Sequence, residues 1–381
     1  MANLVYRRLF KIALAVLLAG CASEPVHQHS EYPNVKNLHG TIPPVPQQTK
    51  YTSNNNLQSK TPPVLYPENE PFQPYPNRVE SAPYSSSYDA LILTGTYANS
   101  PAVRDFIQHM VHKYGFSETY LNGLFSRANR LDSVIRLESP APSAGPSTPR
   151  PGSWTRYRNK FLTDAHISNG VEFWHNNAAS IQQASITYGV DPEYIVGIIG
   201  VETYFGKNFG KTCIFDALTT LSFDTYRRAS YFRSELENFL LMTRDEDFDP
   251  RQPQGSWAGA MGYGQFMPSS FRKLAVDFNK DGRRDLWHPK DAVGSVAHYF
   301  SRSGWQFHNP VTKRTEPAAD PSVIELSTYE GNEYWRIYPN FKVIKKYNNS
   351  NKYAMAVHQL AQAIKQKYQQ DYATGGGYIT N

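Results

Sequence analysis

One apolar segment that ends in a carboxyl group constrains the fold of this chain more than any other feature. Residues 195–201 are all aliphatic residues or glycine, and Glu202 follows them directly. Asp191 is a suitable helix cap and Pro192 a suitable first helical residue. A helix that is apolar on every side must be covered by other elements. The sequence therefore predicts a buried helix that carries a carboxyl group at its C-terminal end, with Gly206 as its stop.

Helical spacing of apolar residues also recurs elsewhere in the chain. Ser100 and Pro101 favour the start of a helix, and Gly115 favours its end. Strand signals are sparse, and residues 341–344 carry the strongest one. The other helical patterns cover residues 121–131, 171–184, 291–303 and 351–368. These patterns predict a mainly α fold.

Residues 1–21 have the features of an export signal. A positively charged start precedes an apolar run that is too short to span a bilayer as a helix. The run ends in a Leu-Ala-Gly-Cys quartet at residues 18–21. The quartet resembles the lipobox of bacterial lipoproteins, in which the cysteine receives a lipid; the alternative is an ordinary signal peptide. Ala22 differs from the aspartate that commonly retains lipoproteins at the inner membrane. We therefore expect a chain anchored through Cys21 at the periplasmic face of the outer membrane.

Residues 22–88 carry 12 prolines and few aliphatic residues. Such a segment cannot bury enough apolar surface to offset the entropy of ordering, so we expect a disordered tether. Residues 89–381 are expected to form the folded region. The formal net charge is only +6, and Lys and Arg form no block, so nucleic acid is not an expected partner. Aromatic residues make up 14% of the chain, which suits either core packing or contact with sugar rings.

The surroundings predicted for Glu202 have a chemical consequence. Burial disfavours the charged form of a carboxyl group, and the negative end of a helix dipole acts in the same direction. Both effects keep the group protonated near neutral pH, as a general acid requires. The alternative is a partly buried glutamate paired with Arg227 or Arg228. The residue types alone leave both interpretations open.

Two motifs give the chain a resemblance to a known enzyme family. Residues 200–203, Gly-Val-Glu-Thr, followed by Gly206, resemble the glutamate motif of lytic transglycosylases. Residues 259–270, Gly-Ala-Met-Gly-Tyr-Gly-Gln-Phe-Met-Pro-Ser-Ser, resemble the second motif of that family. Residues 216–221, Arg227 and Arg228 add to the match. Together they make the chain similar to family 3 of these enzymes, from about residue 99 to about residue 366.

This resemblance implies a lysozyme-like helical fold with a groove that binds peptidoglycan glycan strands. The implied reaction cleaves the β-1,4 bond between N-acetylmuramic acid and N-acetylglucosamine and leaves a 1,6-anhydromuramoyl end. Glu202 is then the catalytic acid and afterwards the base, within a catalytic region at residues 89–381. The implied substrate-binding residues are Tyr157, Ser256, Gln265, Tyr347, Asn348 and Tyr353. Core packing is the alternative role for the tyrosines.

One carboxyl group is enough for such a reaction, and no catalytic cofactor is expected. Most glycosidases use a second carboxylate as nucleophile or base, but a 2-acetamido sugar can supply its own nucleophile. The acidic run at residues 245–249 is expected to be a solvated loop. One alternative is a muramidase that uses water. The other is a wall-binding lipoprotein with an inactive site, against which the intact motif at residues 259–268 argues.

The segment from Asp277 to Asp291 begins like a calcium-binding EF-hand loop. The expected ligands are Asp277, Asn279, Asp281, the Arg283 carbonyl and Asp291, with Gly282 at the sharp turn. His288 stands in place of the usual closing glutamate, and the resembled family has a similar longer loop closed by an aspartate. We expect a structural Ca²⁺, whose binding is weakened by the charges of Arg283 and Arg284. The alternative is a turn without metal.

The expected architecture is thus a lysozyme-like helical core with an added N-terminal helical part, the EF-hand-like loop and at most a small β element. The stretch between Trp305 and Tyr338 is shorter than in the resembled family. Its β content is therefore left open.

Overall fold

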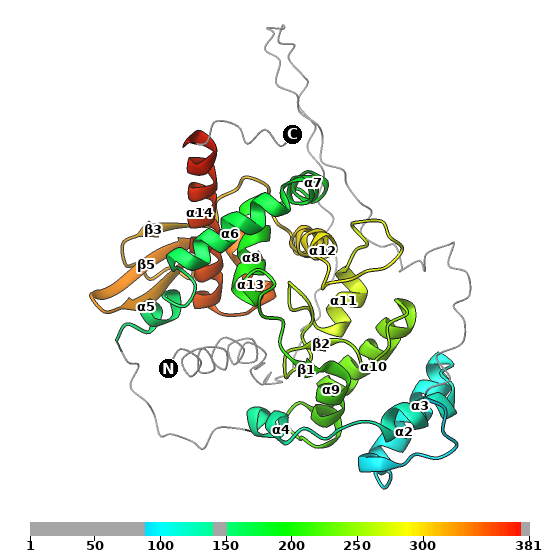
Figure 1. Cartoon of the computed structure of the whole chain (residues 1–381). Helices are drawn as coiled ribbons and strands as arrows, with labels where there is room; N and C mark the ends of the chain where they lie inside the picture. The colour runs from blue at the N-terminus through cyan, green and yellow to red at the C-terminus, as the bar shows by residue number, and fades with distance from the viewer. Residues whose placement is uncertain (1–87, 140–150, 375–381) are drawn as a thin grey trace, which may run out of the picture.

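The computed structural model describes residues 88–139 and 151–374, which fold mainly into α-helices (Figure 1). The predicted signal sequence, the predicted lipidation site Cys21 and all of the predicted tether except Tyr88 lie outside the described residues. Within the described part, no helix is long and apolar enough to cross a membrane. The helices are η2 (Gly95–Tyr97), α2 (Pro101–Tyr114), α3 (Glu118–Ser126), α4 (Asp132–Glu138), α5 (Ser153–Arg158), α6 (Asp164–Asn176), α7 (Ala178–Tyr188), α8 (Pro192–Thr203), α9 (Ile214–Phe223), α10 (Ala229–Asp245), α11 (Pro268–Leu274), α12 (Pro289–Arg302), α13 (Pro339–Tyr347) and α14 (Asn351–Thr374).

The helix predicted from residue 100 is confirmed at both ends. The Ser100 hydroxyl accepts a hydrogen bond from Val103 N at 3.4 Å, and α2 begins directly after it. Gly115 ends the helix in the left-handed conformation, with φ 67°. Glycine adopts that conformation without the steric cost that other residues meet.

Two predicted helical patterns are wrong in their extent. The pattern at residues 121–131 covers the end of α3 and the connection to α4, and the pattern at residues 171–184 covers parts of two helices, α6 and α7. The break between these two falls at Asn177, whose side chain donates to Phe173 O at 2.9 Å. Apolar spacing continues across such breaks because both sides pack on one core. The spacing therefore cannot reveal them.

Two small antiparallel sheets accompany the helices. β1 (Thr212–Cys213) pairs with β2 (Gln254–Gly255). A three-stranded sheet has the order β3-β5-β4 and consists of β3 (Thr312–Thr315), β4 (Val323–Thr328) and β5 (Gly331–Ile337). It lies between Trp305 and Tyr338. This stretch, whose β content the sequence leaves open, therefore holds a small β element.

The strand predicted at residues 341–344 is wrong, because these residues lie in α13. Pro339 occupies the first turn of that helix, and Phe341 and Ile344 are both fully buried. A separation of three residues on one buried face is helical spacing. The actual strand β5 contains no fully buried residue, so it lacks the alternation that marks a half-buried strand.

α8 lies at the centre of the core, as predicted. It packs against α6, α7, α12 and α14, and residues 193–201 are all buried. A Cβ atom on Gly197 would lie 3.0 Å from Ala361 Cβ of α14. The absence of a side chain at Gly197 therefore lets α14 approach the helix that carries Glu202.

The start of α8 differs from its prediction in one respect. Asp191 precedes the helix, but its side chain makes no capping hydrogen bond. Its carboxylate instead accepts hydrogen bonds from Trp305 Nε1 at 2.9 Å and from His308 N at 3.2 Å. Asp191 thus fastens the segment after α12 to the start of α8.

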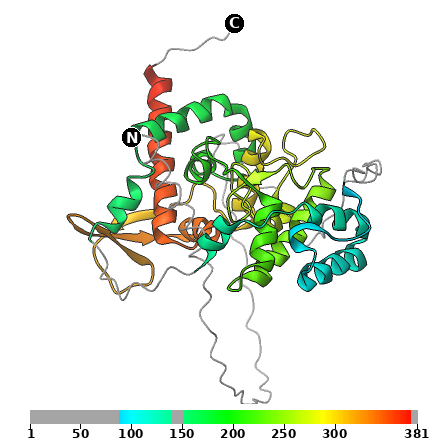
Figure 2. The same ribbon diagram turned by 60° about the horizontal axis from the view of Figure 1, so that its bottom comes forward.

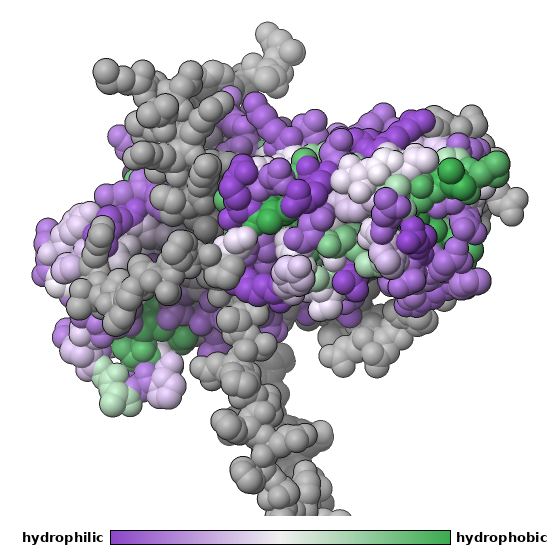
Figure 3. Space-filling view, turned by 90° about the horizontal axis from the view of Figure 1, so that it is seen from below, coloured by the Kyte–Doolittle hydropathy of each residue, from purple (hydrophilic) through white to green (hydrophobic). Residues whose placement is uncertain are grey.

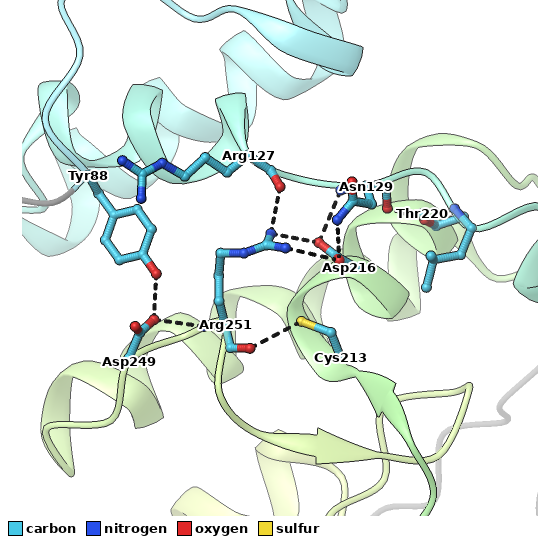
Figure 4. A network of polar contacts seen from close by, with 9 residues as sticks. Tyr88, Arg127, Asn129, Cys213, Asp216, Thr220, Asp249 and Arg251 are labelled. Atoms are coloured by element: carbon cyan, nitrogen blue, oxygen red, sulfur yellow. Dashed lines mark hydrogen bonds and ion pairs between the residues drawn. The ribbon is translucent and has the colours of Figure 1, made fainter.

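The N-terminal helices α2 and α3 lie beside α9 and α10, at the end of the molecule away from α14 and the three-stranded sheet (Figures 1 and 2). Asp216 of α9 is buried, and its carboxylate accepts hydrogen bonds from Asn129 Nδ2 at 3.0 Å and Arg251 Nη1 at 2.9 Å (Figure 4). Tyr88 donates to Asp249 Oδ1 at 2.6 Å. These polar contacts fasten the N-terminal helical part to the core.

The acidic run at residues 245–249 is not the solvated loop that the sequence predicts. Glu246 is buried and pairs with the buried Arg284, whose Nε lies 2.9 Å from Glu246 Oε1. Asp249 accepts the hydrogen bond of Tyr88, and only Asp247 in this run is exposed. The carboxylates of this acidic run join distant segments of the chain, which explains why acidic residues gather there.

Apolar side chains gather inside the molecule rather than on its surface. One buried hydrophobic cluster includes residues from Tyr88 to Ile364. The face shown in Figure 3 is mostly hydrophilic, with hydrophobic residues in separate patches. Helices from both ends of the described chain therefore share one core.

Candidate active site

Glu202 lies in the last turn of α8. Part of its side-chain surface remains accessible, while protein surrounds its carboxyl group. Tyr353 of α14 donates a hydrogen bond to Glu202 Oε1 at 2.5 Å. Burial raises the pKa of Glu202 to about 7, although the hydrogen bond from Tyr353 acts in the opposite direction. The Glu202 carboxyl group is therefore protonated in a large share of the molecules at neutral pH, as a general acid requires.

The alternative ion pair between Glu202 and an arginine is not formed. Arg228 Nε donates to Glu138 Oε1 at 3.0 Å, and Arg227 Nε lies 3.4 Å from the same oxygen. Glu138 of α4 is itself buried. The two arginines therefore compensate the charge of Glu138.

Four tyrosines from four helices lie near enough to Glu202 for its charge to act on them. They are Tyr157 of α5, Tyr299 of α12, Tyr347 of α13 and Tyr353 of α14. Burial raises the pKa of each phenol, and the negative charge of Glu202 raises it further. All four are thus neutral groups near the carboxyl group at physiological pH.

Tyr299 is the member of this group that the sequence does not reveal. Its ring centroid lies 4.6 Å from that of Tyr347, and its hydroxyl donates to Lys346 O at 2.8 Å. In the sequence it is one aromatic residue in an amphipathic helical pattern. No feature of that pattern distinguishes it from a core residue.

Residues 259–267 of the glycine-rich motif form a loop that contacts both α8 and α13, and the last three residues of the motif begin α11. Thr203, next to Glu202, donates from Oγ1 to Tyr263 O at 3.0 Å. Tyr347 donates to Gly264 O at 2.5 Å. A Cβ atom on Gly262 would lie 2.3 Å from Leu286 O. The glycines therefore let this loop pack closely against protein.

Two of the predicted binding residues, Gln265 and Ser256, make hydrogen bonds within this region. Gln265 has φ 51°, and its Nε2 donates to Gly262 O at 3.0 Å. Ser256 is buried, and its Oγ accepts a hydrogen bond from Ala260 N at 2.9 Å. Both side chains hold the shape of the loop in this structure.

Asn348 differs from them, because its amide has no partner. The residue follows Tyr347 and is 5% exposed. Neither its Oδ1 nor its Nδ2 atom forms a hydrogen bond. An unsatisfied buried polar group costs about 1–3 kcal/mol, so a ligand that pairs with this amide would recover free energy.

The predicted calcium loop is closed by hydrogen bonds to carboxylates. Asp291 is fully buried and accepts hydrogen bonds from Phe278 N at 2.9 Å and Asp285 N at 2.9 Å. Asp277 Oδ2 accepts a hydrogen bond from Gly282 N at 2.9 Å, and Gly282 has φ 93°. The sharp turn predicted at Gly282 is therefore present.

The oxygen atoms of this loop suit a hard cation. Asp277 Oδ1 and Asn279 Oδ1 both accept the N–H of Asp281, at 3.1 and 3.0 Å, so these two oxygens lie close together. In the described part of the chain, no three His, Cys, Asp or Glu side chains form a metal-holding group. The expected donors here combine carboxylate, amide and carbonyl oxygens, a set that suits Ca²⁺.

The two arginines of the loop are both paired. Arg283 Nη2 lies 2.8 Å from Asp247 Oδ2, and Arg284 is held by Glu246. Acidic partners thus offset the positive charges that would otherwise weaken the binding of a cation.

Comparisons with known proteins agree in one direction. The family model described as the transglycosylase SLT domain matches residues 98–322 and 311–362. Membrane-bound lytic murein transglycosylase B of Escherichia coli (strain K12) is 44% identical over 311 residues, which cover 73% of this chain and 86% of that protein.

Solved structures resemble the chain over a similar extent. The Escherichia coli lytic transglycosylase SLT35 in complex with bulgecin A is 43% identical, with a TM-score of 0.67, and the match covers 76% of this chain and 99% of the solved one. SLT35 in complex with calcium is 44% identical, with a TM-score of 0.68 and the same coverage of 76% and 99%.

Proposed function

The chain belongs to the transglycosylase SLT domain family and is a peptidoglycan lytic transglycosylase, and on this premise we propose that Glu202 is its single catalytic carboxyl group. The predicted family, the mainly α lysozyme-like fold and the predicted enzyme class are confirmed by these matches. One observation carries the proposal for Glu202. Its carboxyl group is enclosed at the end of α8, and burial raises its pKa to about 7.

The proposed reaction has two steps. In the first, protonated Glu202 donates its proton to the oxygen of the β-1,4 bond. At the same time, the carbonyl oxygen of the 2-acetamido group of N-acetylmuramic acid bonds to C1 of the same sugar. The N-acetylglucosamine side then leaves as a free alcohol. In the second, ionised Glu202 takes the proton of the C6 hydroxyl, and the C6 oxygen displaces the acetamido oxygen from C1. The product carries a 1,6-anhydro ring, and Glu202 is protonated again.

The other buried carboxylates of the described chain support a mechanism with one carboxyl group. Glu235, for example, accepts hydrogen bonds from Ser269 N at 2.8 Å and from Ser269 Oγ at 2.7 Å. Every other buried carboxylate there also has a protein partner: Glu138, Asp191, Glu193, Asp216, Glu246 and Asp291. A substrate that supplies its own nucleophile does not need a second carboxylate from the enzyme.

We further propose that the glycan contacts Tyr157, Ser256, Gln265, Tyr347, Asn348 and Tyr353. The unpaired amide of Asn348 supports this most directly, because the hydroxyl and acetamido groups of a sugar can both donate and accept hydrogen bonds. Tyr353 has a second role in the proposal. Its hydrogen bond to Glu202 stabilises the carboxylate that the first step produces. Ser256 and Gln265 have a second role as well, because their hydrogen bonds hold the loop in shape.

The mass of the products tests the reaction type. Purified peptidoglycan is digested with the enzyme, and the released muropeptides are weighed by mass spectrometry. We expect products one water lighter than those of hydrolysis, because the C6 hydroxyl replaces water. Products at the hydrolytic mass would favour the water-using muramidase. No release of products would favour a wall-binding protein with an inactive site.

For the loop from Asp277 to Asp291, we propose a structural Ca²⁺ held by Asp277, Asn279, Asp281, the Arg283 carbonyl and Asp291. The close approach of the Asp277 and Asn279 oxygens supports this, as does the similar enzyme SLT35, solved in complex with calcium. Ca²⁺ would supply charge that holds these oxygens together, and no catalytic step passes through it.

We also propose that the chain is anchored to a membrane. The similar Escherichia coli protein is described as membrane-bound, and the lipobox-like quartet supports a lipid at Cys21. Residues 22–88 would then act as the tether between the outer membrane and a catalytic region that begins near Tyr88. Labelling with a radioactive fatty acid tests the anchor, and Cys21→Ser should abolish the label.

A further inference from the structure

The turn that follows Glu202 has an uncommon backbone conformation. Tyr204, Phe205 and Gly206 have φ values of 54°, 58° and 82°. A left-handed conformation costs a non-glycine residue about 1–2 kcal/mol. Two such residues in succession therefore require neighbours that hold them. Because the turn begins two residues after Glu202, whatever holds it also fixes the last turn of α8.

One face of α6 holds this turn. His166, Asn169 and Gly170 share that face, since residues three and four apart lie on one side of a helix. The His166 ring centroid lies 4.5 Å from that of Tyr204, and Asn169 Nδ2 donates to Tyr204 Oη at 2.5 Å. Gly170 leaves room for Phe205, because a Cβ atom there would lie 2.9 Å from Phe205 Cζ.

His166 also bonds to α8 directly. Its Nε2 atom lies 3.0 Å from Gly200 O, two residues before Glu202. A carbonyl oxygen can only accept, so Nε2 must carry the proton. Burial lowers the pKa of His166, so the ring is neutral at neutral pH and this N–H is fixed in place. The same carbonyl also accepts the N–H of Tyr204 at 3.0 Å.

His166 further connects α8 with the tyrosines around Glu202. Its ring lies 6.0 Å from that of Phe161, and the Phe161 ring lies 5.4 Å from that of Tyr157. Tyr157 is one of the four phenols that the charge of Glu202 affects. His166 thus contacts α8 directly and is linked to Tyr157 through Phe161, while it lies outside the group of tyrosines.

We propose that His166 is a positioning residue, which fixes the orientation of the Glu202 carboxyl group by donating to Gly200 O and packing on Tyr204. This inference rests on the proposed catalytic role of Glu202. A displacement of about 1 Å at a reacting group can lower a rate about 10²-fold. Loss of the His166 donor should therefore lower kcat about 10- to 100-fold and leave KM nearly unchanged, because the proposed substrate contacts remain.

Two amide substitutions isolate the reach of the donor. In His166→Gln the side-chain N–H can reach Gly200 O, whereas in His166→Asn it is one bond too short. We expect His166→Gln to keep kcat within a few-fold of wild type and His166→Asn to show the full loss. If His166→Asn does not fold, His166→Phe replaces it, since it keeps the ring and lacks the donor. Equal kcat values for His166→Gln, for His166→Asn (or His166→Phe in its place) and for wild type would overturn the inference.

His358 provides a matched control, because it contacts α8 at the end opposite to Glu202. It is a partly buried histidine whose Nδ1 lies 2.8 Å from the hydroxyl of Tyr194 on α8. His358→Asn should lower the melting temperature without lowering kcat per folded molecule. An equal loss of kcat in His358→Asn would reduce the effect at His166 to general packing of α8, and the inference would fail.

Glu202→Gln is measured in the same assay to separate this inference from the proposal beneath it. If Glu202→Gln stays active, the catalytic assignment fails whatever His166 does. If Glu202→Gln is inactive and the donor-free variant of His166 keeps its full kcat, the positioning role alone fails.

Discussion

At the scale of single residues, two opposing effects set the protonation of Glu202. Burial raises its pKa to about 7, while the Tyr353 hydroxyl donates to the carboxylate and lowers that pKa. The acid step requires the protonated form, so activity should fall as pH rises through about 7. Tyr353→Phe removes the lowering effect, so the alkaline limb of the kcat/KM profile should move to higher pH.

The same substitution should also slow the reaction, since a hydrogen bond to a charged group contributes about 1.5–3 kcal/mol, or about 10- to 100-fold. Tyr97→Phe is the matched control. Tyr97 is a buried tyrosine that donates to Asp224 Oδ2 at 2.7 Å in the N-terminal part, and its loss should leave the profile in place. An alkaline limb that does not move in Tyr353→Phe would show that this hydrogen bond does not control Glu202.

The residues of the site differ in how far the sequence reveals them. The burial of Glu202 follows from the apolar residues that directly precede it. Its partner Tyr353 lies 151 positions away, so local patterns cannot connect the two, and only the family resemblance indicates Tyr353. Tyr299 matches no motif, and helical spacing describes a core tyrosine equally well. Contacts between distant segments are the part that local physics leaves undetermined.

At the scale of elements, the loop from Asp277 to Asp291 should behave as a calcium-dependent brace. A ligand at a hundredfold excess over its Kd stabilises the native state by about 2.7 kcal/mol. Ca²⁺ should therefore raise the melting temperature relative to chelator, with turnover nearly unchanged. Asp281→Asn should reduce this shift. Asp371→Asn, which removes an exposed carboxylate of α14 that pairs with Lys367 outside the loop, should preserve it. Identical melting curves in Ca²⁺ and chelator would remove the metal from the account.

Elements are predictable where one periodic pattern and its end signals agree. α2 has both a serine cap and a terminal glycine, and its bounds follow. α6 and α7 share one pattern interrupted at Asn177, so spacing alone merges them. β5 is half-exposed along most of its length and therefore lacks a strong pattern. Its three-stranded sheet depends on pairing with β3 and β4, which sequence periodicity does not encode.

At the scale of the whole molecule, the buried carboxylate of Asp216 fastens the N-terminal helices to the core. It accepts hydrogen bonds from Asn129 and Arg251 (Figure 4). Asp216→Asn removes the charge and turns an amide donor toward these donors. The free energy of unfolding should fall by about 2–3 kcal/mol. Hydrogen exchange should rise most in residues 88–131, while kcat per folded molecule stays near wild type. Asp132→Asn, at an exposed ion pair with Arg130, should change little. Exchange that rises equally along the chain would contradict a local fastening.

The activity of Glu202→Gln shows whether Glu202 is the catalytic carboxyl group. The amide keeps the shape of the side chain but can neither donate nor accept the proton, and loss of general acid catalysis alone costs about 10²- to 10⁴-fold. Because Glu202 acts in both steps, release of anhydromuropeptides should fall by about 10⁴-fold or more. Glu235→Gln, at a buried carboxylate bonded to Ser269, should retain activity.

Folding is measured on the same samples. The pKa of Glu202 is raised from 4.5 to about 7 in the folded protein, so its ionisation destabilises the wild-type fold progressively as pH rises through that interval. Glu202→Gln lacks this effect and should be the more stable protein above pH 7. We expect a folded, stable variant that releases almost no anhydromuropeptides. Substantial release by the folded variant, or a loss of activity that only follows unfolding, would contradict it.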